Sequence, residues 1–113
     1  MRFLFKILTA VDWQNAVAAG VFRGVAVDQK DGFIHLSADH QARETAARHF
    51  SGVADLVLVA FAETSLARLK WEPSRGGDLF PHVYGDIPTD AAAWVKPLPL
   101  ENGVHRFPDE VGP

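Results

Sequence analysis

The chain has 113 residues, a net charge of −3 and 48% hydrophobic residues. This length is typical of one domain, and the apolar content suffices for a core and is too high for a disordered chain. The absence of cysteine excludes disulfides, cysteine-ligated zinc, iron–sulfur clusters and a thiol nucleophile. The slightly acidic balance argues against bulk, non-specific binding to nucleic acid.

The hydrophobic residues are not arranged as in a membrane span or a signal peptide. The longest apolar run, residues 56–62, is far shorter than the roughly 20 residues that a membrane helix needs. Lys6 interrupts the apolar N-terminus, and no small-residue cleavage site follows. We therefore expect a cytoplasmic protein with one domain over residues 1–113, no membrane partner, and a frayed tail over residues 108–113.

The first part of the chain predicts a strand and a helix. Side chains alternate over residues 2–8, with one mainly apolar face, which is typical of a strand. Thr9 and Gly20 have the residue types of a helix N-cap and a left-handed C-cap, so we expect a helix over residues 10–19. Residues 21–32 are interpreted as turns.

The middle of the chain predicts a short strand, a second helix and a buried strand. Residues 33–37 have the pattern of a strand, and Ser37 is expected to cap a helix whose apolar stripe ends at Phe50. Residues 56–62 are apolar on both faces, which predicts a strand in the middle of a covered sheet.

The last part of the chain predicts strands joined by tight turns. Residues 69–72 and 80–84 are interpreted as strands on either side of a loop over residues 74–78. The proline in the second of these strands predicts that it lies at a sheet edge. Asn102 and Gly103 are the strongest hairpin signal. Strands outnumber helices, so we expect an α+β protein with two main helices and a mixed or antiparallel sheet.

Five histidines need a chemical explanation, and strand alternation separates them. Alternate positions place Phe33, His35 and Ser37 on one face of a strand, and Phe80, His82 and Tyr84 on one face of a later strand. Two strands that each present an aromatic ring, a histidine and a hydroxyl group are expected to form two walls of one cleft. The alternative is that each histidine makes a structural hydrogen bond.

The other three histidines are interpreted as structural or solvated. His40 and His49 point to nearly opposite sides of one helix, so they cannot share a metal ion. His105 lies on a largely apolar hairpin face and is expected to pack there. A zinc site built from His35, His82 and a carboxylate is an open alternative.

The loop between the two later strands is rich in glycine and charge. Arg75 is followed by Gly76 and Gly77, which places a guanidinium beside backbone N–H groups that a phosphate or carboxylate can approach. Glu72 precedes this loop and is a candidate to bind a ribose hydroxyl or to stabilise positive charge. The alternative is a turn in which Arg75 pairs with Asp78.

Residues 31–37 and 71–85, together with the aromatic segment 3–7, resemble a small bacterial family, the domain of unknown function numbered 952. The resemblance covers nearly the whole chain. It implies a fold related to the ADP-ribosyltransferases, in which a split, strongly bent sheet and its helices bind NAD in a cleft.

A shorter match points to the same fold group. Residues 35–37 resemble the His-Leu-Ser segment of the RNA 2′-phosphotransferases, which consume NAD, and the resemblance assigns their ribose-contacting histidine to His35. The additional arginines of those enzymes have no matching motif in this chain. Other ADP-ribosyltransferases place a tyrosine or histidine and then a glutamate on later strands, and Tyr84, His82 and Glu72 match by residue type.

The first functional hypothesis is therefore a protein that binds NAD or a related nucleotide and acts as an ADP-ribosyl or glycosyl transferase without a metal. The catalytic candidates are Glu72, His35 and His82. The ligand-binding candidates, for ribose, phosphate and the nicotinamide ring, are Ser37, Arg75, Gly76, Gly77, Phe80 and Tyr84. Two alternatives are a non-catalytic module for a phosphorylated or acidic metabolite and a histidine-based metal-dependent hydrolase.

Overall fold

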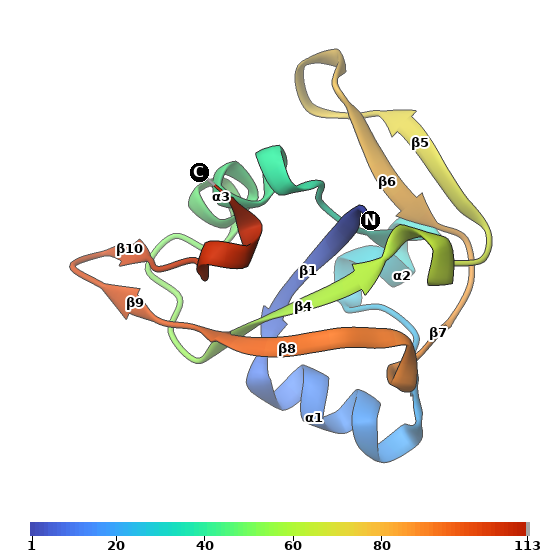
Figure 1. Cartoon of the computed structure of the whole chain (residues 1–113), viewed down its shortest axis with the longest axis horizontal. Helices are drawn as coiled ribbons and strands as arrows, with labels where there is room; N and C mark the ends of the chain where they lie inside the picture. Colours follow the sequence, from blue (N-terminus) through green and yellow to red (C-terminus); the bar gives the residue numbers. More distant parts are fainter. Residues whose placement is uncertain (113) are drawn as a thin grey trace.

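The computed structural model describes residues 1–112, with the backbone alone at Arg75. This part of the chain forms three α-helices, α1 (Ala10–Ala19), α2 (Ala26–Asp31) and α3 (Asp39–His49) (Figure 1). It also forms ten strands: β1 (Phe3–Thr9), β2 (Val21–Phe22), β3 (Ile34–His35), β4 (Leu56–Ala62), β5 (Leu69–Pro73), β6 (Leu79–Val83), β7 (Ile87–Pro88), β8 (Ala92–Leu98), β9 (Leu100–Glu101) and β10 (Val104–His105).

The strands pair in several antiparallel sheets. One three-stranded sheet has the order β1-β4-β8 and a second has the order β3-β6-β5, while β2-β7 and β9-β10 are two-stranded. An isolated bridge between Phe5 and Ser37 connects the first sheet to the chain that leaves β3. The α+β class is therefore confirmed. All strand pairs among residues 1–112 are antiparallel, and α2 adds a third helix to the two that were expected.

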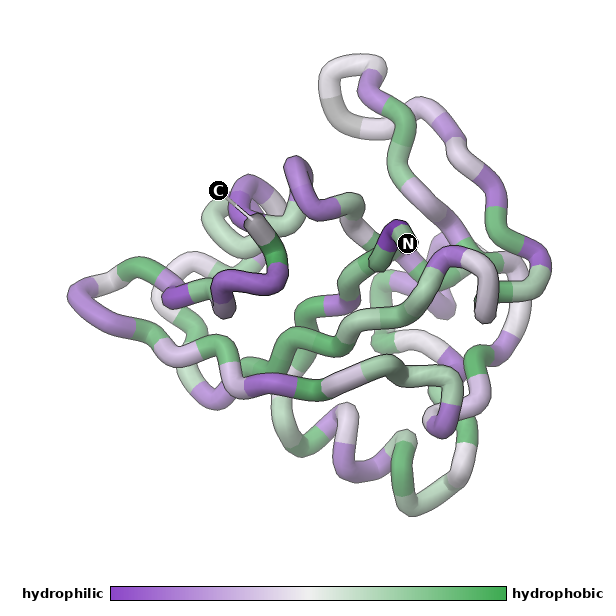
Figure 2. The backbone as a smooth tube through the Cα atoms, in the orientation of Figure 1, coloured by the Kyte–Doolittle hydropathy of each residue, from purple (hydrophilic) through white to green (hydrophobic). Residues whose placement is uncertain are grey.

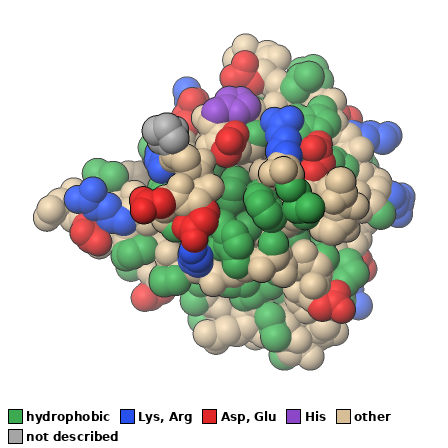
Figure 3. Space-filling model, in the orientation of Figure 1, with side chains coloured by type: hydrophobic (Ala, Val, Ile, Leu, Met, Phe, Trp, Pro, Cys, Tyr) green, Lys and Arg blue, Asp and Glu red, His purple; other side chains and the backbone are tan. Residues whose placement is uncertain are grey.

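The core lies on both faces of β4, as its continuous apolar sequence predicts. Its alternate residues Val59 and Phe61 pack with Trp13 of α1, whereas Leu58 and Ala60 pack in a second cluster with α3. Figure 2 shows the apolar character that runs along β1 and β4. Figure 3 shows apolar side chains over the middle of this sheet, between acidic and basic groups.

Local signals account for the bounds of α1. Thr9 Oγ1 accepts a hydrogen bond from the Asp12 backbone N–H at 3.1 Å, and Gly20 ends the helix in the left-handed conformation with φ 78°. These contacts satisfy backbone groups that the helix ends leave without partners. The predicted helix over residues 10–19 is confirmed. Asn102 and Gly103 also have the positive φ values, 52° and 79°, of the predicted hairpin turn.

The strand β6 lies in the middle of its sheet, so the edge position predicted from its proline is wrong. The carbonyl of Pro81 faces β3 and accepts from the Leu36 N–H at 3.0 Å. Because the N and C=O of a strand residue point to the same side, the missing N–H of Pro81 also faces β3. Pro81 therefore cannot return a hydrogen bond to Leu36, and the paired part of β3 ends at His35.

The C-terminal segment differs from the frayed tail that the sequence predicts. A single 3-10 turn, Asp109–Val111, places Val111 in the core cluster on the α3 side of β4, where it is 2% exposed. Lys96 also donates to the Glu110 carboxylate. Burial of one apolar side chain thus fixes this segment through residue 112, and residue 113 lies outside the described residues.

No helix in residues 1–112 combines the length and the apolar character needed to cross a lipid bilayer.

Replacing Leu58 with alanine tests the central position of β4. The side chain is fully buried, so we expect the free energy of unfolding to fall by about 2–5 kcal/mol because a cavity remains. Tm, measured by thermal unfolding, should fall by roughly 10 °C or more. The control Val104→Ala removes an exposed side chain and should change stability by at most about 0.5 kcal/mol. An unchanged Tm for Leu58→Ala would contradict the buried position of β4.

Candidate functional site

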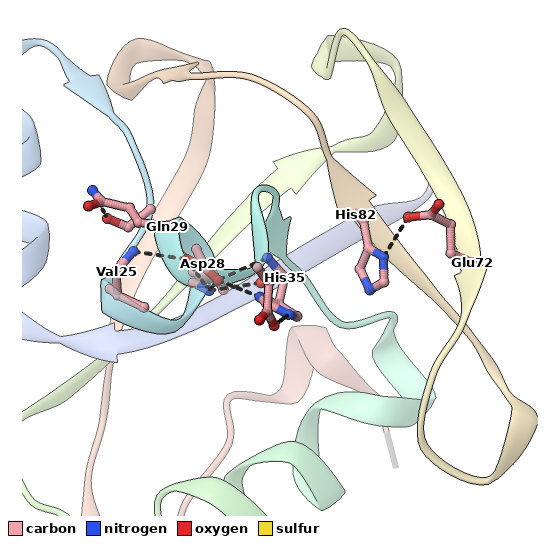
Figure 4. Close-up of polar contacts among 9 residues, drawn as sticks. Val25, Asp28, Gln29, His35, Glu72 and His82 are labelled. Atoms are coloured by element: carbon pink, nitrogen blue, oxygen red, sulfur yellow. Dashed lines mark hydrogen bonds and ion pairs between the residues drawn. The ribbon is translucent and has the colours of Figure 1, made fainter.

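The pairing of β3 with β6 brings two of the predicted histidines together. In this antiparallel register His35 lies directly opposite His82, and their ring centroids are 5.5 Å apart. Glu72 reaches His82 from the neighbouring strand β5 (Figure 4). Tyr84, which directly follows β6, contacts the same carboxylate. Four candidates from two distant parts of the sequence therefore gather on one face of the second sheet.

His82 is buried, with 4% of its surface exposed, and it is oriented by Glu72. Its Nδ1 lies 2.8 Å from Glu72 Oε1, and the Tyr84 hydroxyl donates to the same oxygen at 2.7 Å. An ionised carboxylate only accepts, so His82 Nδ1 carries a proton. Among the described side chains, which do not include that of Arg75, no hydrogen-bond partner reaches His82 Nε2. In the neutral ring this buried atom is an acceptor.

The hydrogen bonds at Glu72 alter two ionisation equilibria. Donation by Tyr84, and then by His82, lowers the pKa of Glu72 below its usual range. The same bond to Glu72 raises the pKa of Tyr84, since the phenol must stay protonated to donate. Lys70 Nζ lies 5.0 Å from the centre of the Tyr84 ring. The result is a fixed anion with a neutral phenol and a histidine as its donors.

His35 is held between two carboxylates. Its Nδ1 lies 2.6 Å from Asp28 Oδ1, and its Nε2 lies 2.9 Å from Asp31 Oδ2. The Nδ1 contact is a hydrogen bond to Asp28, whereas Nε2 faces the Asp31 carboxylate at ion-pair distance. The His35 side chain is 32% exposed and Asp31 is 40% exposed, whereas Asp28 is 1% exposed. The Nε2 side of His35 is therefore the side that solvent or a ligand can reach.

Asp28 is a site residue that the sequence did not reveal. It lies on α2, within the stretch interpreted as turns, and accepts hydrogen bonds from His35, from Lys6 Nζ at 3.0 Å and from the Val25 N–H at 2.9 Å. Burial alone would raise the pKa of Asp28, but the hydrogen bond from His35 and the charge of Lys6 lower it to about 2. Burial also lowers the pKa of Lys6, against the opposing effect of Asp28.

Two residues, Lys6 and Gly24, are signals of this buried pair. Lys6 occupies the same face of β1 as the core residues Leu4 and Leu8, and a lone lysine on a core face needs a buried anionic partner. Gly24 is also required: it has φ 96°, and a Cβ there would lie 2.7 Å from the Asp28 Cβ. Neither signal identifies the partner, because 22 residues separate Lys6 from Asp28.

Ser37 does not share the site with His35, contrary to the prediction from alternation. The strand β3 ends at His35, and the following chain turns to bridge Phe5 of the first sheet. Ser37 is buried, and its hydroxyl lies 2.9 Å from Thr45 Oγ1. It also does not cap α3, whose N-cap is Ala38.

The glycine loop lies away from the histidines. His82 pairs with Lys70, four residues before the loop begins at Ser74, which is about 13 Å at roughly 3.3 Å per residue. Figure 1 shows this hairpin tip projecting from the molecule. Gly76 and Gly77 have positive φ values, and Gly77 N–H donates to Ser74 within the turn. The side chain of Arg75 lies outside the described residues.

Phe33 fills the space between the histidines where the sequence predicts a cleft. Its ring stacks on His82 with centroids 4.1 Å apart, and it lies 4.6 Å from His35 and 5.2 Å from Tyr84. A depression of about 140 Å³ adjoins Phe33 and Asp28, but neither histidine lines it. The predicted stacking residue Phe80 is buried two positions before His82.

A second groove and His105 lie apart from the histidine pair. A more open groove of about 480 Å³ lies between the β5-β6 hairpin and the start of α3, lined by residues that include Trp71 and His40. His105 is 8% exposed and its Nε2 lies 2.8 Å from the Val53 carbonyl, so its predicted packing role is confirmed.

Asp28 makes stability depend on pH in acid. Its pKa is about 2 in the folded protein against an ordinary 3.8, so its contribution is complete above about pH 4 and is lost as the pH falls through 2. In Asp28→Asn we expect the free energy of unfolding to fall less steeply over this range than in wild type, as measured by urea unfolding. Asp86→Asn, at an exposed position, should keep the wild-type slope. A shared slope in all three proteins would refute this assignment.

Tyr84 gives a direct spectroscopic test of the hydrogen bond to Glu72. It is the one tyrosine in the chain, so phenolate absorbance during an alkaline titration reports Tyr84 alone. In Glu72→Ala we expect the Tyr84 pKa to fall from its raised value toward 10.0. Glu63→Ala is the matched control, because Glu63 bonds to Trp71 instead. The same Tyr84 midpoint in Glu72→Ala and wild type would show that this bond does not form.

The chain is similar over nearly its whole length to protein CC0527 from Caulobacter crescentus. The crystal structure of that protein is 47% identical with a TM-score of 0.90, and the match covers 96% of this chain and 97% of that chain. A crystal structure of its double mutant gives 46% identity, a TM-score of 0.90 and the same coverage. Its solution NMR structure gives 46% identity and a TM-score of 0.85, covering 97% of each chain. No curated protein matches this chain.

A family comparison agrees with the resemblance that the sequence motifs carry. The model of the family described as "Protein of unknown function (DUF952)" matches residues 7–95. This range includes the segment with Asp28 and His35 and the segment with Glu72, His82 and Tyr84. The chain therefore belongs to the DUF952 family.

Proposed function

We propose that this protein binds NAD or a related ribose-containing nucleotide beside His35, His82 and Glu72, and acts as an ADP-ribosyl or glycosyl transferase. The observation that carries the proposal is the different hydrogen-bonding surroundings of the two histidines. His82 Nε2 is a buried acceptor without a partner among the described side chains, whereas His35 Nε2 lies at the surface, 2.9 Å from an oxygen of the Asp31 carboxylate. Such a pair suits a ligand that presents a hydroxyl group beside a second oxygen.

A ribose ring offers this combination, because each hydroxyl of its vicinal diol both donates and accepts. The histidine ring centroids are 5.5 Å apart, so neighbouring hydroxyls of one sugar can contact both rings. We assign one hydroxyl to His82 Nε2 and its neighbour to His35 Nε2, where it replaces Asp31. The rings of Phe33 and Tyr84 flank the histidines and supply stacking surface for a planar base.

Glu72 is the residue proposed to assist transfer. Its Oε1 is fixed by two donors, and among the described side chains, which leave out Arg75, no donor reaches Oε2. The lowered pKa of Glu72 favours the anion, which would stabilise positive charge on the ribose as the bond from C1′ to nicotinamide breaks. Nicotinamide leaves with the bonding electrons, an acceptor hydroxyl bonds to C1′, and the proton of that hydroxyl passes to solvent water.

The ligand class also draws on the resemblance to the ADP-ribosyltransferases, and a fold of that type is part of the proposal. Ser37 has no place in it, because its hydroxyl is engaged with Thr45. Phe33 stacks on His82, so a ligand reaches His82 only after this ring moves. Gly32 precedes Phe33 with φ 88°, at the end of α2.

Metal-dependent hydrolysis has less support from the same geometry. Both nitrogens of His35 and the Nδ1 of His82 already face carboxylates, which leaves one free nitrogen in the pair. In the part of the chain that the structure describes, no three His, Asp or Glu side chains are grouped to hold a metal ion. A metal site generally needs three or four such ligands.

Isothermal titration calorimetry with NAD, combined with chromatographic detection of nicotinamide, tests the proposed function. We expect binding by wild type, and binding at least roughly tenfold weaker in His35→Ala and Glu72→Ala because each loses a charged hydrogen-bonding group. His40→Ala is the matched control at an exposed histidine on α3, and its affinity should equal that of wild type. No heat of binding with millimolar NAD would refute the proposal. Binding without nicotinamide release would favour the non-catalytic binding module.

A further inference from the structure

We infer that Lys6 and Asp28 are positioning residues for His35: a buried ion pair that fixes the orientation of the imidazole and keeps its Nδ1 proton in place. The inference deepens the proposed function and rests on it for its biological role. The arrangement itself lies behind the ligand-facing side and involves the first sheet, a helix and the second sheet. Asp28 lies outside the segments that carry the family resemblance.

Lys6 has no capacity to serve a ligand. It projects from the middle of β1 and is 6% exposed. Its Nζ lies 3.0 Å and 2.8 Å from the two oxygens of Asp28, and 2.9 Å from the backbone carbonyl of His35. An ammonium group has three N–H donors, and three acceptors surround it here. Every donor of Lys6 is thus directed at Asp28 or at the backbone of His35.

Asp28 holds His35 at two points. Its Oδ1 accepts from the backbone N–H of His35 at 3.1 Å and from the ring Nδ1 at 2.6 Å. Its Oδ2 accepts from the Val25 N–H, which fixes the carboxylate relative to the start of α2. Contacts to both the backbone and the ring leave the imidazole one orientation, with Nε2 facing outward. Figure 4 shows Asp28 between Val25 and His35.

The two carboxylates that orient the histidines differ in access. Asp28 is 1% exposed, whereas Glu72 is 33% exposed and has a free second oxygen among the described residues. Glu72 is therefore able to contact a ligand as well as His82, and Asp28 is not. At the outer nitrogen of His35, the half-exposed Asp31 occupies the place that a ligand oxygen would take.

Stability alone does not explain the pair. A buried ion pair contributes little net stability, because desolvation offsets the attraction between the charges, and apolar residues of similar size are often as stable. Removing one partner is costly because it leaves a buried charge without its counter-ion. The informative variant therefore removes both charges together.

NMR of the histidine ring protons in the ligand-free protein tests the inference. In wild type we expect a slowly exchanging Nδ1–H signal from His35 and another from His82. The double variant Lys6→Met/Asp28→Ala should lose the His35 signal and keep that of His82. Glu72→Ala is the matched control at the other histidine and should show the reverse. Indole signals of the three tryptophans report whether each variant is folded.

Titration of the same variants with NAD tests whether this positioning affects ligand binding. We expect Lys6→Met/Asp28→Ala to bind NAD roughly tenfold or more weakly, a loss typical of one charged hydrogen bond. A folded double variant that keeps both the His35 Nδ1–H signal and wild-type affinity would overturn the inference, as would a wild type without that signal. If wild type shows the signal and the double variant loses it while neither binds NAD, the positioning role stands and the proposed function fails.

The single variant Lys6→Met decides the matter if the double variant does not fold. It leaves Asp28 bonded to His35, so the buried carboxylate keeps hydrogen-bond donors from the ring and the backbone of His35. We expect its His35 Nδ1 proton to exchange with water at least roughly tenfold faster than in wild type, because Asp28 has lost the group that fixes it. An unchanged exchange rate in this variant would overturn the inference.

Discussion

The buried contact between Lys6 and Asp28, together with the bridge between Phe5 and Ser37, joins the first sheet to α2 and to the second sheet. Lys6 belongs to the first sheet, Asp28 to the short helix α2, and the His35 carbonyl that Lys6 also binds belongs to the second sheet. Because a buried ammonium must have all its donors satisfied, this one residue specifies where α2 and β3 lie relative to β1. The position of His35 follows from that constraint.

The second constraint is the register of β3 against β6, which sets His35 opposite His82. His35 is bonded to the buried Asp28, and His82 is bonded to the partly exposed Glu72. The two histidines therefore have different chemical surroundings. On the outer side of this face Asp31 lies beside His35, and Glu72 contacts both His82 and Tyr84, whereas the Lys6–Asp28 pair is buried behind it.

Local sequence signals predicted the elements that depend on neighbouring residues. Thr9 and Gly20 define α1, and the apolar run of β4 defines the sheet centre. Alternation correctly placed His82 and Tyr84 on one side of the chain at β6, because a period of two is a property of the strand itself. Residues that depend on distant partners were missed or misplaced. The role of Asp28 depends on its contact with Lys6, and the position of Ser37 depends on its bridge to β1. Pro81 is tolerated in a central strand because β3, its neighbour, is only two residues long.

Because β3 is only two residues long, the face that carries both histidines depends on a very short strand pairing. Residues 28–35 carry one histidine with its carboxylate, and residues 72–84 carry the other with its own. Each of these modules contains the hydrogen bond between its own histidine and carboxylate. The two residue pairs between β3 and β6 place the modules side by side. A change that slips this ladder by one residue would leave both modules intact and turn one histidine to the opposite face. The face that carries both histidines therefore depends on the pairing of two segments, and neither segment forms it alone.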